Sequence, residues 1–338
     1  MPTIREVAAV CGVSIASVSR ILNNDETYKV SPQTRDKVFR VAEELHYAPS
    51  PAYQRKSKTK KINSIACIIN ATAEKNDDSY YTAILEGIKT ELAKNDYVVD
   101  YLSSQYELDS ATLESVLNRG HFNGIILMTT PPADSLKIIQ NRFEHIVCVD
   151  TSLTQYDNVR YNRFEAGCLA MQYLIENGHK KIAFIGSYIP TKFNLQFGRY
   201  DAYRTMMQRY GYPMRKEWIL DCNWERQLCY EMTKKLVSSD DLPTAIFFAS
   251  DYMAIASLSA LHEEKIRVPE DISIIGISDI EESKYLSPPL TTISIPQFEI
   301  GQIVTSTLLA RIKGDNSPPK QIYVPTKLIE RKSVAKIK

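Results

Sequence analysis

Residues 3–23 read TIREVAAVCGVSIASVSRILN, and this stretch predicts two short helices joined by a tight turn. Thr3 and Glu6 have the spacing of a capping box, which satisfies backbone N–H groups at the start of a helix. Gly12 stands where a helix end takes a left-handed residue, and Ser14 can cap the helix that follows. Apolar residues recur three and four positions apart, at Ile4, Val7, Ala8, Cys11, Val18, Ile21 and Leu22.

A third helix is predicted to start at Ser31, which can act as its N-cap, with Pro32 at the first helical position. It ends before Pro49, because the residue that precedes a proline disfavours helical backbone. Its apolar stripe consists of Val38, Val41, Ala42 and Leu45. Two short helices braced by a third indicate an all-α three-helix helix-turn-helix head at residues 1–49. A protein-binding helical bundle is the alternative for the same pattern.

The second helix carries side chains suited to the major groove of DNA. Arg20 can form two parallel hydrogen bonds with a guanine or a phosphate. Ile15 and Ala16 offer only apolar contact, for example to a thymine methyl group. The residues of the head that we predict to contact DNA are Thr3, Ser14, Ile15, Ala16, Ser17, Ser19, Arg20 and Asn23.

The charge of the chain is unevenly placed. The 338 residues carry a net charge of +1, but residues 1–61 hold eleven Lys/Arg and six Asp/Glu, a net of +5. The remaining 30 basic and 34 acidic residues give the rest of the chain a net of −4. A basic head on an acidic body is expected when one small module meets phosphate; a solvated basic face is the alternative.

Composition excludes several classes of protein. With 44% apolar and 24% charged residues the chain can bury cores, which excludes wholesale disorder. No apolar run approaches the length of a membrane span, and the first residues lack the apolar core of a signal peptide, so we expect a cytoplasmic protein without membrane contact. The six cysteines form no C-x-x-C pair, which argues against a zinc finger and a disulfide framework.

From Ile62 onward, apolar runs such as KKIAFIG alternate with amphipathic helical stretches, which predicts an α/β body with mainly parallel sheets. About ten such strands exceed one comfortable sheet, so two similar lobes are expected. The body has no G-x-G-x-x-G, P-loop or G-x-S-x-G motif, and the five histidines of the chain lie far apart. We therefore expect no enzyme activity, cofactor or metal.

The head motif, together with VSPQTRDKVFRVAEELHYAP at residues 30–49, resembles the lactose/galactose repressor family of bacterial transcription regulators. NGHKKIAFIG, DISIIGISD, SPPLTTI and VPTKLIERKS, all between residues 177 and 333, resemble motifs of its body. The resemblance implies a homodimer that binds palindromic operator DNA, and a periplasmic-binding-protein-like body with an effector between its lobes. No leucine heptad follows Lys327, which favours a dimer over a tetramer.

The linker at residues 50–61, SPAYQRKSKTKK, departs from that family. The resemblance implies a hinge helix that wedges a leucine into the minor groove, but Lys56 stands at that place. We expect Arg55, Lys56 and the neighbouring lysines to bind phosphate, with Tyr53 as the candidate wedge. A flexible linker is the alternative in the absence of DNA.

The resemblance implies eight candidate residues for the effector site, most of them at strand ends and Tyr80 and Tyr81 just before a helix. Their types suit a sugar, which needs polar groups for its hydroxyls and an aromatic face for its C–H side. Arg199 matches the family's ligand-binding arginine, with an interlobe salt bridge as the alternative. One of the two neighbouring tyrosines, Tyr80 and Tyr81, can instead pack in the core. Ser278 stands where the family usually has a carboxylate, which Asp279 can replace. The full set is Tyr80, Tyr81, Asp150, Arg199, Trp224, Asp251, Ser278 and Asp279.

The resemblance places the first lobe at about 62–160 and 292–322 and the second at about 161–291 and 323–338, with crossings near 158–163, 288–293 and 320–325. The expected function is a transcriptional repressor switched by a sugar. Ser278 and the long spacer at 23–27 lean toward galactose or a galactoside. A ligand-independent DNA-binding regulator and a cytoplasmic sugar-acting enzyme are the alternatives.

Overall fold

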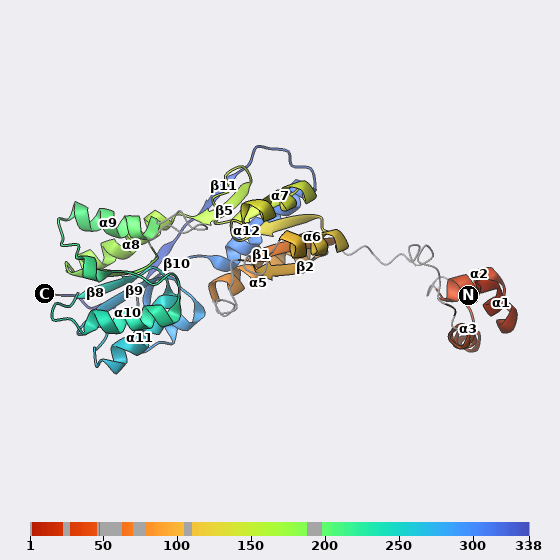
Figure 1. Ribbon diagram of the computed structural model, residues 1–338, viewed down its shortest axis with the longest axis horizontal. Coiled ribbons are helices and arrows are strands. Elements are labelled where there is room, and N and C mark those ends of the chain that lie inside the picture. The colour runs from red at the N-terminus through yellow and green to blue at the C-terminus, as the bar shows by residue number, and fades with distance from the viewer. Residues whose placement is uncertain are drawn as a thin grey trace. The chain divides into compact units, whose positions relative to one another are not determined.

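The structure is a computed structural model that describes residues 2–22, 28–45, 47, 63–69, 79–104, 110–187 and 198–337. It divides into two compact units, residues 1–62 and residues 63–338 (Figure 1). The first unit contains the predicted head and the second contains the predicted body. None of the helices in the described ranges is long and apolar enough to cross a membrane.

The head contains the three expected helices, α1 (Ile4–Cys11), α2 (Ile15–Leu22) and α3 (Pro32–Glu44). The Thr3 backbone N–H donates to the Glu6 carboxylate at 2.6 Å, which caps α1. Gly12 ends this helix in the left-handed region, with φ of 70°. One core joins the three helices, and its most buried members are Val7, Val18, Ile21 and Val38. The expected helix-turn-helix fold is confirmed.

The first lobe of the body is built on a six-stranded parallel sheet in the order β11-β5-β4-β3-β1-β2. Alternate residues of β1 point to opposite faces, so that Ile65 and Cys67 join one core cluster while Ala66 and Ile68 join the other. The helices α5 and α12 cover the first of these faces, and α6 and α7 cover the second. The elements are β1 (Asn63–Ile69), α5 (Ser79–Lys94), β2 (Tyr97–Ser104), α6 (Ser110–Arg119), β3 (Gly124–Leu127), α7 (Ala133–Arg142), β4 (Ile146–Val149), β5 (Asp157–Tyr161), α12 (Gln297–Ile312) and β11 (Gln321–Val324).

The second lobe repeats this plan with strand order β12-β10-β9-β8-β6-β7, in which only the pairing of β12 with β10 is antiparallel. The helices α8 and α9 pack side by side on one face of the sheet, and α10 and α11 on the other (Figure 1). The elements are α8 (Arg163–Glu176), β6 (Ile182–Gly186), α9 (Gly198–Arg209), η1 (Lys216–Trp218), β7 (Ile219–Asp221), α10 (Arg226–Val237), β8 (Ala245–Phe248), α11 (Asp251–Glu263), β9 (Ser273–Ser278), η2 (Glu281–Lys284), β10 (Thr291–Ser294) and β12 (Lys327–Ile329).

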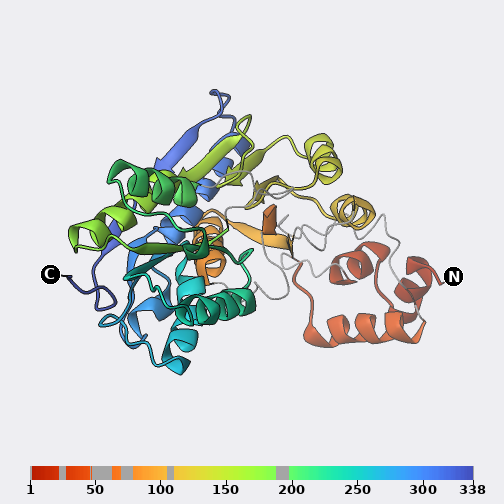
Figure 2. The same cartoon turned by 60° about the vertical axis from the view of Figure 1, so that its left-hand side comes forward.

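The chain passes between the two lobes three times, after Tyr161, after Ser294 and after Val324 (Figure 2). Thr291–Ser294 pair with β9 of the second lobe, so the passage expected before residue 292 lies after Ser294 instead. The α/β two-lobe architecture is as expected.

The helices α5 and α12 approach each other at two glycines, Gly87 and Gly301. A Cβ atom on Gly301 would lie 2.1 Å from the carbonyl oxygen of Ile84, and one on Gly87 would lie 2.1 Å from that of Phe298. These carbonyl oxygens belong to the helix backbone, which cannot move aside as the end of a flexible side chain can. The absence of side chains here therefore sets the spacing of the two helices on the first sheet.

We predict that Gly301→Ala lowers the unfolding free energy by about 1–3 kcal/mol, because the added methyl group forces α12 away from α5. Urea unfolding followed by circular dichroism would measure the change. Thr90→Ala, at an exposed position of α5, is the control and should not lower stability, because alanine favours a helix more than threonine does. Equal stability of the two variants would contradict the proposed close approach.

Candidate functional site

The outward face of α2 consists of the residues predicted to contact DNA. Ile15 is 44% exposed, and Ser14, Ala16 and Arg20 are also exposed, whereas Val18 and Ile21 on the opposite face are completely buried. Ser17 and Ser19 are partly buried at the edge of this face. The core side of α2 therefore holds the helix in place and leaves its outward side chains in solvent.

Tyr28 supports this face, although the sequence did not single it out. Its hydroxyl lies 2.8 Å from the hydroxyl of Ser17, and the Arg20 guanidinium stacks over its ring at 5.3 Å from the centroid. The cation–π contact limits the conformations of Arg20 while leaving its N–H groups for a partner. The signal in the sequence was an aromatic residue just before α3.

The other predicted DNA contacts have different positions. Thr3 is exposed and caps α1, and its hydroxyl donates to the Glu6 carboxylate at 3.2 Å. Asn23, Tyr53, Arg55 and Lys56 lie outside the described residues.

In the body, side chains from both lobes meet in one group, which we call the interlobe cluster. The first lobe supplies Tyr80 on α5, Asp150 just after β4 and Tyr161 at the end of β5. The second lobe supplies Arg163 and Arg199, at the starts of α8 and α9, and Trp224 just after β7. The cluster is Tyr80, Asp150, Tyr161, Arg163, Arg199 and Trp224, and four of these were predicted from the sequence.

An ion pair between Asp150 and Arg163 joins the two lobes within this cluster. The Arg163 Nη2 and Nε atoms donate to the Asp150 Oδ2 atom at 2.7 and 3.1 Å. Both side chains are largely buried, and Asp150 adopts the left-handed region, with φ of 53°. Charge-assisted bonds of this length are among the stronger hydrogen bonds in proteins. Sequence reasoning missed Arg163 because it comes just after a strand end, among several charged residues.

Arg199 is held by aromatic rings rather than by an acid. Its guanidinium lies 5.2 Å from the Trp224 ring centroid and 5.7 Å from that of Tyr161, and its Nη2 atom donates to the Tyr161 hydroxyl. The Nε atom is buried and has no acceptor in the described part of the chain. Asn223 and Trp224 both have positive φ, which turns the indole back toward the arginine.

Tyr80 supplies a neutral hydroxyl to the cluster. Burial, followed by the nearby Tyr161 and Asp150, raises the pKa of Tyr80 well above its ordinary value, so the group stays protonated at neutral pH. Tyr81 packs against Tyr80 edge to face at 5.2 Å between ring centroids. Tyr81 therefore supports the ring of Tyr80, and its own contact with an effector stays a prediction.

Asp251 lies in a closed hydrogen-bonded environment within the second lobe, and its role as an effector contact stays a prediction. Its side chain is completely buried. Its carboxylate accepts hydrogen bonds from the hydroxyls of Ser283 and Thr292, both at 2.6 Å, and from the backbone N–H groups of Asp279 at 2.8 Å and Ile280 at 3.3 Å. These bonds use both carboxylate oxygens, so Asp251 anchors the segment after β9 to β10.

Ser278 and Asp279 belong to the same hydrogen-bonded group as Asp251. Ser278 is buried, and its carbonyl oxygen accepts a hydrogen bond from the Gln297 side chain at the start of α12. Asp279 forms an ion pair with Arg331 at 2.6 Å, and its role as an effector contact stays a prediction. Five of the eight predicted effector residues thus lie in or against the interlobe cluster. The other three, Asp251, Ser278 and Asp279, form a separate hydrogen-bonded group, which we call the Asp251 frame.

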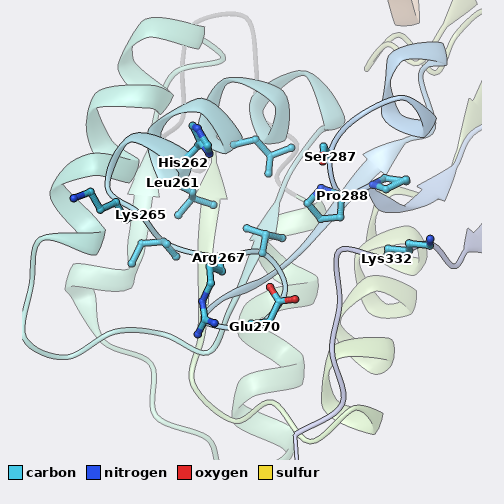
Figure 3. Close-up of a pocket in the computed structure, with 12 residues that line it drawn as sticks. Leu261, His262, Lys265, Arg267, Glu270, Ser287, Pro288 and Lys332 are labelled. Carbon is cyan, nitrogen blue, oxygen red and sulfur yellow. The ribbon is translucent and has the colours of Figure 1, made fainter.

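A surface pocket of the second lobe lies elsewhere. Leu261, His262 and Lys265 of α11 and its following loop line it, together with Pro288 and Lys332 (Figure 3). None of the predicted site residues takes part. This pocket is therefore a feature separate from the interlobe cluster.

Comparison with known proteins relates both units to one family. Residues 3–50 match the family of bacterial regulatory proteins described as lacI, and residues 171–334 match the periplasmic binding protein-like domain. The chain is 31% identical to the HTH-type transcriptional repressor PurR of Yersinia pestis (strain Pestoides F), over 99% of this chain and 97% of that protein.

Solved structures of regulators have the same fold. A transcriptional regulator CelR–cellobiose complex matches with a TM-score of 0.70 at 25% identity, over 98% of this chain and 100% of the other. A LacI family regulator from Enterococcus faecium with bound ribose matches with a TM-score of 0.71 at 26% identity, over 82% and 100%. The Lac repressor dimer bound to operator matches with a TM-score of 0.70 at 23% identity, over 99% of each chain.

We predict a pH dependence of stability that arises from Asp251. Burial raises the pKa of its carboxyl from 3.8 to about 6, against the hydrogen bonds from Ser283, Thr292 and the Asp279 backbone. The folded state then holds the proton more tightly than the unfolded chain. The contribution of Asp251 to the unfolding free energy therefore falls by roughly 3 kcal/mol as pH rises from about 4 to about 6.

Urea unfolding of the wild-type protein across this pH range would measure this fall. The variant Asp251→Asn should lack it, because its amide does not titrate. Asp134→Asn, at a highly exposed carboxylate on α7, is the control and should keep the wild-type profile. A wild-type profile for Asp251→Asn would contradict the assignment.

Proposed function

Because the chain belongs to the LacI family of bacterial regulatory proteins, we propose that it binds a palindromic operator as a homodimer. Membership of this family makes it a DNA-binding transcriptional repressor regulated by a small molecule. In our proposal this molecule is a sugar, which binds between the two lobes and changes the affinity of the protein for its operator. The observation that carries the sugar site is the interlobe cluster, in which two lobes bring arginines, hydroxyls and aromatic rings together. A galactose or a galactoside is the first candidate among the sugars.

The exposed face of α2 supports the proposed reading of DNA. Arg20 projects from this face, already stacked on Tyr28, so little freedom is lost when it bonds the edge of a guanine. Ile15, also exposed, can contact a thymine methyl group. In a dimer, two such helices would read the two half-sites of a palindrome.

The chemistry of the interlobe cluster supports a sugar ligand. Trp224 offers an aromatic face for the C–H side of a sugar ring, while the Tyr80 hydroxyl and Arg199 offer hydrogen-bond donors. Relatives of similar fold were solved with cellobiose and with ribose, which supports the same class of ligand here.

The proposed switch depends on contacts that join the lobes. Asp150 and Arg163 link them in the described structure, and a ligand among these residues would change how the lobes pack on each other. An effector shifts an equilibrium only if it binds one state more tightly than the other. A ligand-independent regulator would instead bind its operator identically with and without every sugar.

We predict that Arg20→Ala weakens binding to the preferred operator by about 1–3 kcal/mol relative to random DNA, because a bond to a base edge is lost. The operator would first be selected from random duplexes with the full-length protein, and fluorescence anisotropy would then measure both affinities. Arg40→Ala, at an exposed position of α3, is the control and should leave the ratio unchanged. An unchanged ratio for Arg20→Ala would refute its role.

We also predict that Arg199→Ala binds the operator as the wild-type protein does but no longer responds to the sugar. The reason is that Arg199 lies in the body and contributes donors only to the interlobe cluster. Operator anisotropy with and without added sugar measures both properties. Arg209→Ala, at the exposed end of the same helix, should keep the response. A responsive Arg199→Ala protein would exclude this arginine from the site.

A further inference from the structure

We propose that, among the sugars that could bind this site, the effector is an acidic one, a galactose derivative or another sugar with a carboxylate or phosphate group that Arg199 binds. The inference rests on the proposed function, because it specifies the ligand of the same interlobe cluster. It is carried by three observations: the charge balance of the cluster, the commitment of the nearby acids, and the unpaired donors of Arg199.

The interlobe cluster has an excess of positive charge. It contains two guanidinium groups, on Arg163 and Arg199, and one carboxylate, on Asp150. Arg163 already takes the Asp150 carboxylate, with two donors on one oxygen atom. The charge of Arg199 is therefore the one that has no counterpart among the cluster residues.

The carboxylates of the second lobe that the sequence suggested for the effector site are paired with other partners. Asp279 pairs with Arg331, and Asp251 accepts hydrogen bonds from two hydroxyls and two backbone N–H groups. Ser278, which precedes Asp279, is neutral. No ion pair of Arg199 with an acid occurs within the part of the chain that the structure describes, and an anionic group on the ligand would supply the compensating charge.

The hydrogen bonds of Arg199 are also incomplete. A guanidinium has five N–H donors, and the acceptor that the described structure provides is the Tyr161 hydroxyl. The buried Nε atom has no acceptor among the described residues, which is unfavourable for a donor shielded from water. A carboxylate or phosphate can accept two parallel bonds from the edge of the guanidinium, whereas a sugar hydroxyl is a weaker, neutral acceptor.

The surroundings of Arg199 suit such a pair. The rings of Trp224 and Tyr161 lie against the guanidinium and shield it from water, which strengthens an ion pair formed there. Tyr80 stays protonated and can donate a hydrogen bond to an anionic oxygen.

The test compares acids with their neutral parents on the full-length wild-type protein. Thermal shift and isothermal titration would use galactose with galacturonate, glucose with glucuronate and glucose 6-phosphate, and ribose with ribose 5-phosphate. We expect at least one acid to bind about tenfold or more tightly than its parent, and to lose affinity as salt is raised. Preference for the uronates identifies a carboxylate ligand, and preference for the phosphates identifies a phosphate ligand.

Two results would overturn the inference in different ways. A neutral sugar that binds as tightly as its acid refutes the anionic effector but leaves the proposed sugar-responsive repressor intact. A panel in which neither the neutral sugars nor the acids bind refutes both the anionic effector and the sugar effector.

Variants separate the charge of Arg199 from its packing. Arg199→Gln should reduce the preference for the acid over its neutral parent to less than about twofold, because the positive charge is lost. Arg199→Lys should keep a preference, because lysine keeps the charge although it cannot form the two parallel hydrogen bonds of a guanidinium. Arg209→Gln is the matched control and should keep the wild-type preference. An Arg199→Gln protein with the full preference for the acid would overturn the assignment, and its unliganded melting temperature would show that it folds.

Discussion

The threefold passage of the chain between two parallel sheets is the constraint on which the body depends. Because the passages follow β5, β10 and β11, neither lobe consists of one continuous segment. The lobes therefore cannot separate without unfolding. The carboxyl ends of parallel strands face the same edge of each sheet, and residues that follow them meet there. Tyr161 ends the strand before the first passage and Arg163 begins the helix after it, which places both in the interlobe cluster.

A second consequence of the passages is the frame around Asp251. Its carboxylate binds Thr292 on β10, just before the second passage, and the backbone after β9. Gln297, at the start of α12 in the first lobe, donates to the carbonyl oxygen of Ser278 in the second. This buried polar group therefore fixes the position of one passage. Burying these polar groups costs free energy unless each has a hydrogen-bond partner. When all of them are paired, the network favours one arrangement of the chain over others.

Local patterns in the sequence predicted the head almost completely, because caps and apolar spacing act over a few residues. Gly12 and Ser31 end and begin helices as their chemistry suggests. The site was harder to predict, since a polar residue at a strand end can face a ligand or face the protein. Arg199 and Trp224 come together as expected, whereas Asp251 is sealed by partners far away in sequence. Arg163 could not be identified, because its partnership with Asp150 depends on a left-handed turn that no local signal required.

The placement of the two tryptophans has a spectroscopic consequence. Trp218 is 1% exposed and its indole N–H donates to the Asp241 carbonyl oxygen, so its surroundings are fixed by the second lobe alone. Trp224 lies against a guanidinium in the interlobe cluster, where the proposed effector would change the local field. The tryptophan emission of the unlabelled protein should therefore combine one component that is insensitive to the proposed effector with one that responds to it. The responsive component would make the repressor its own optical reporter of occupancy.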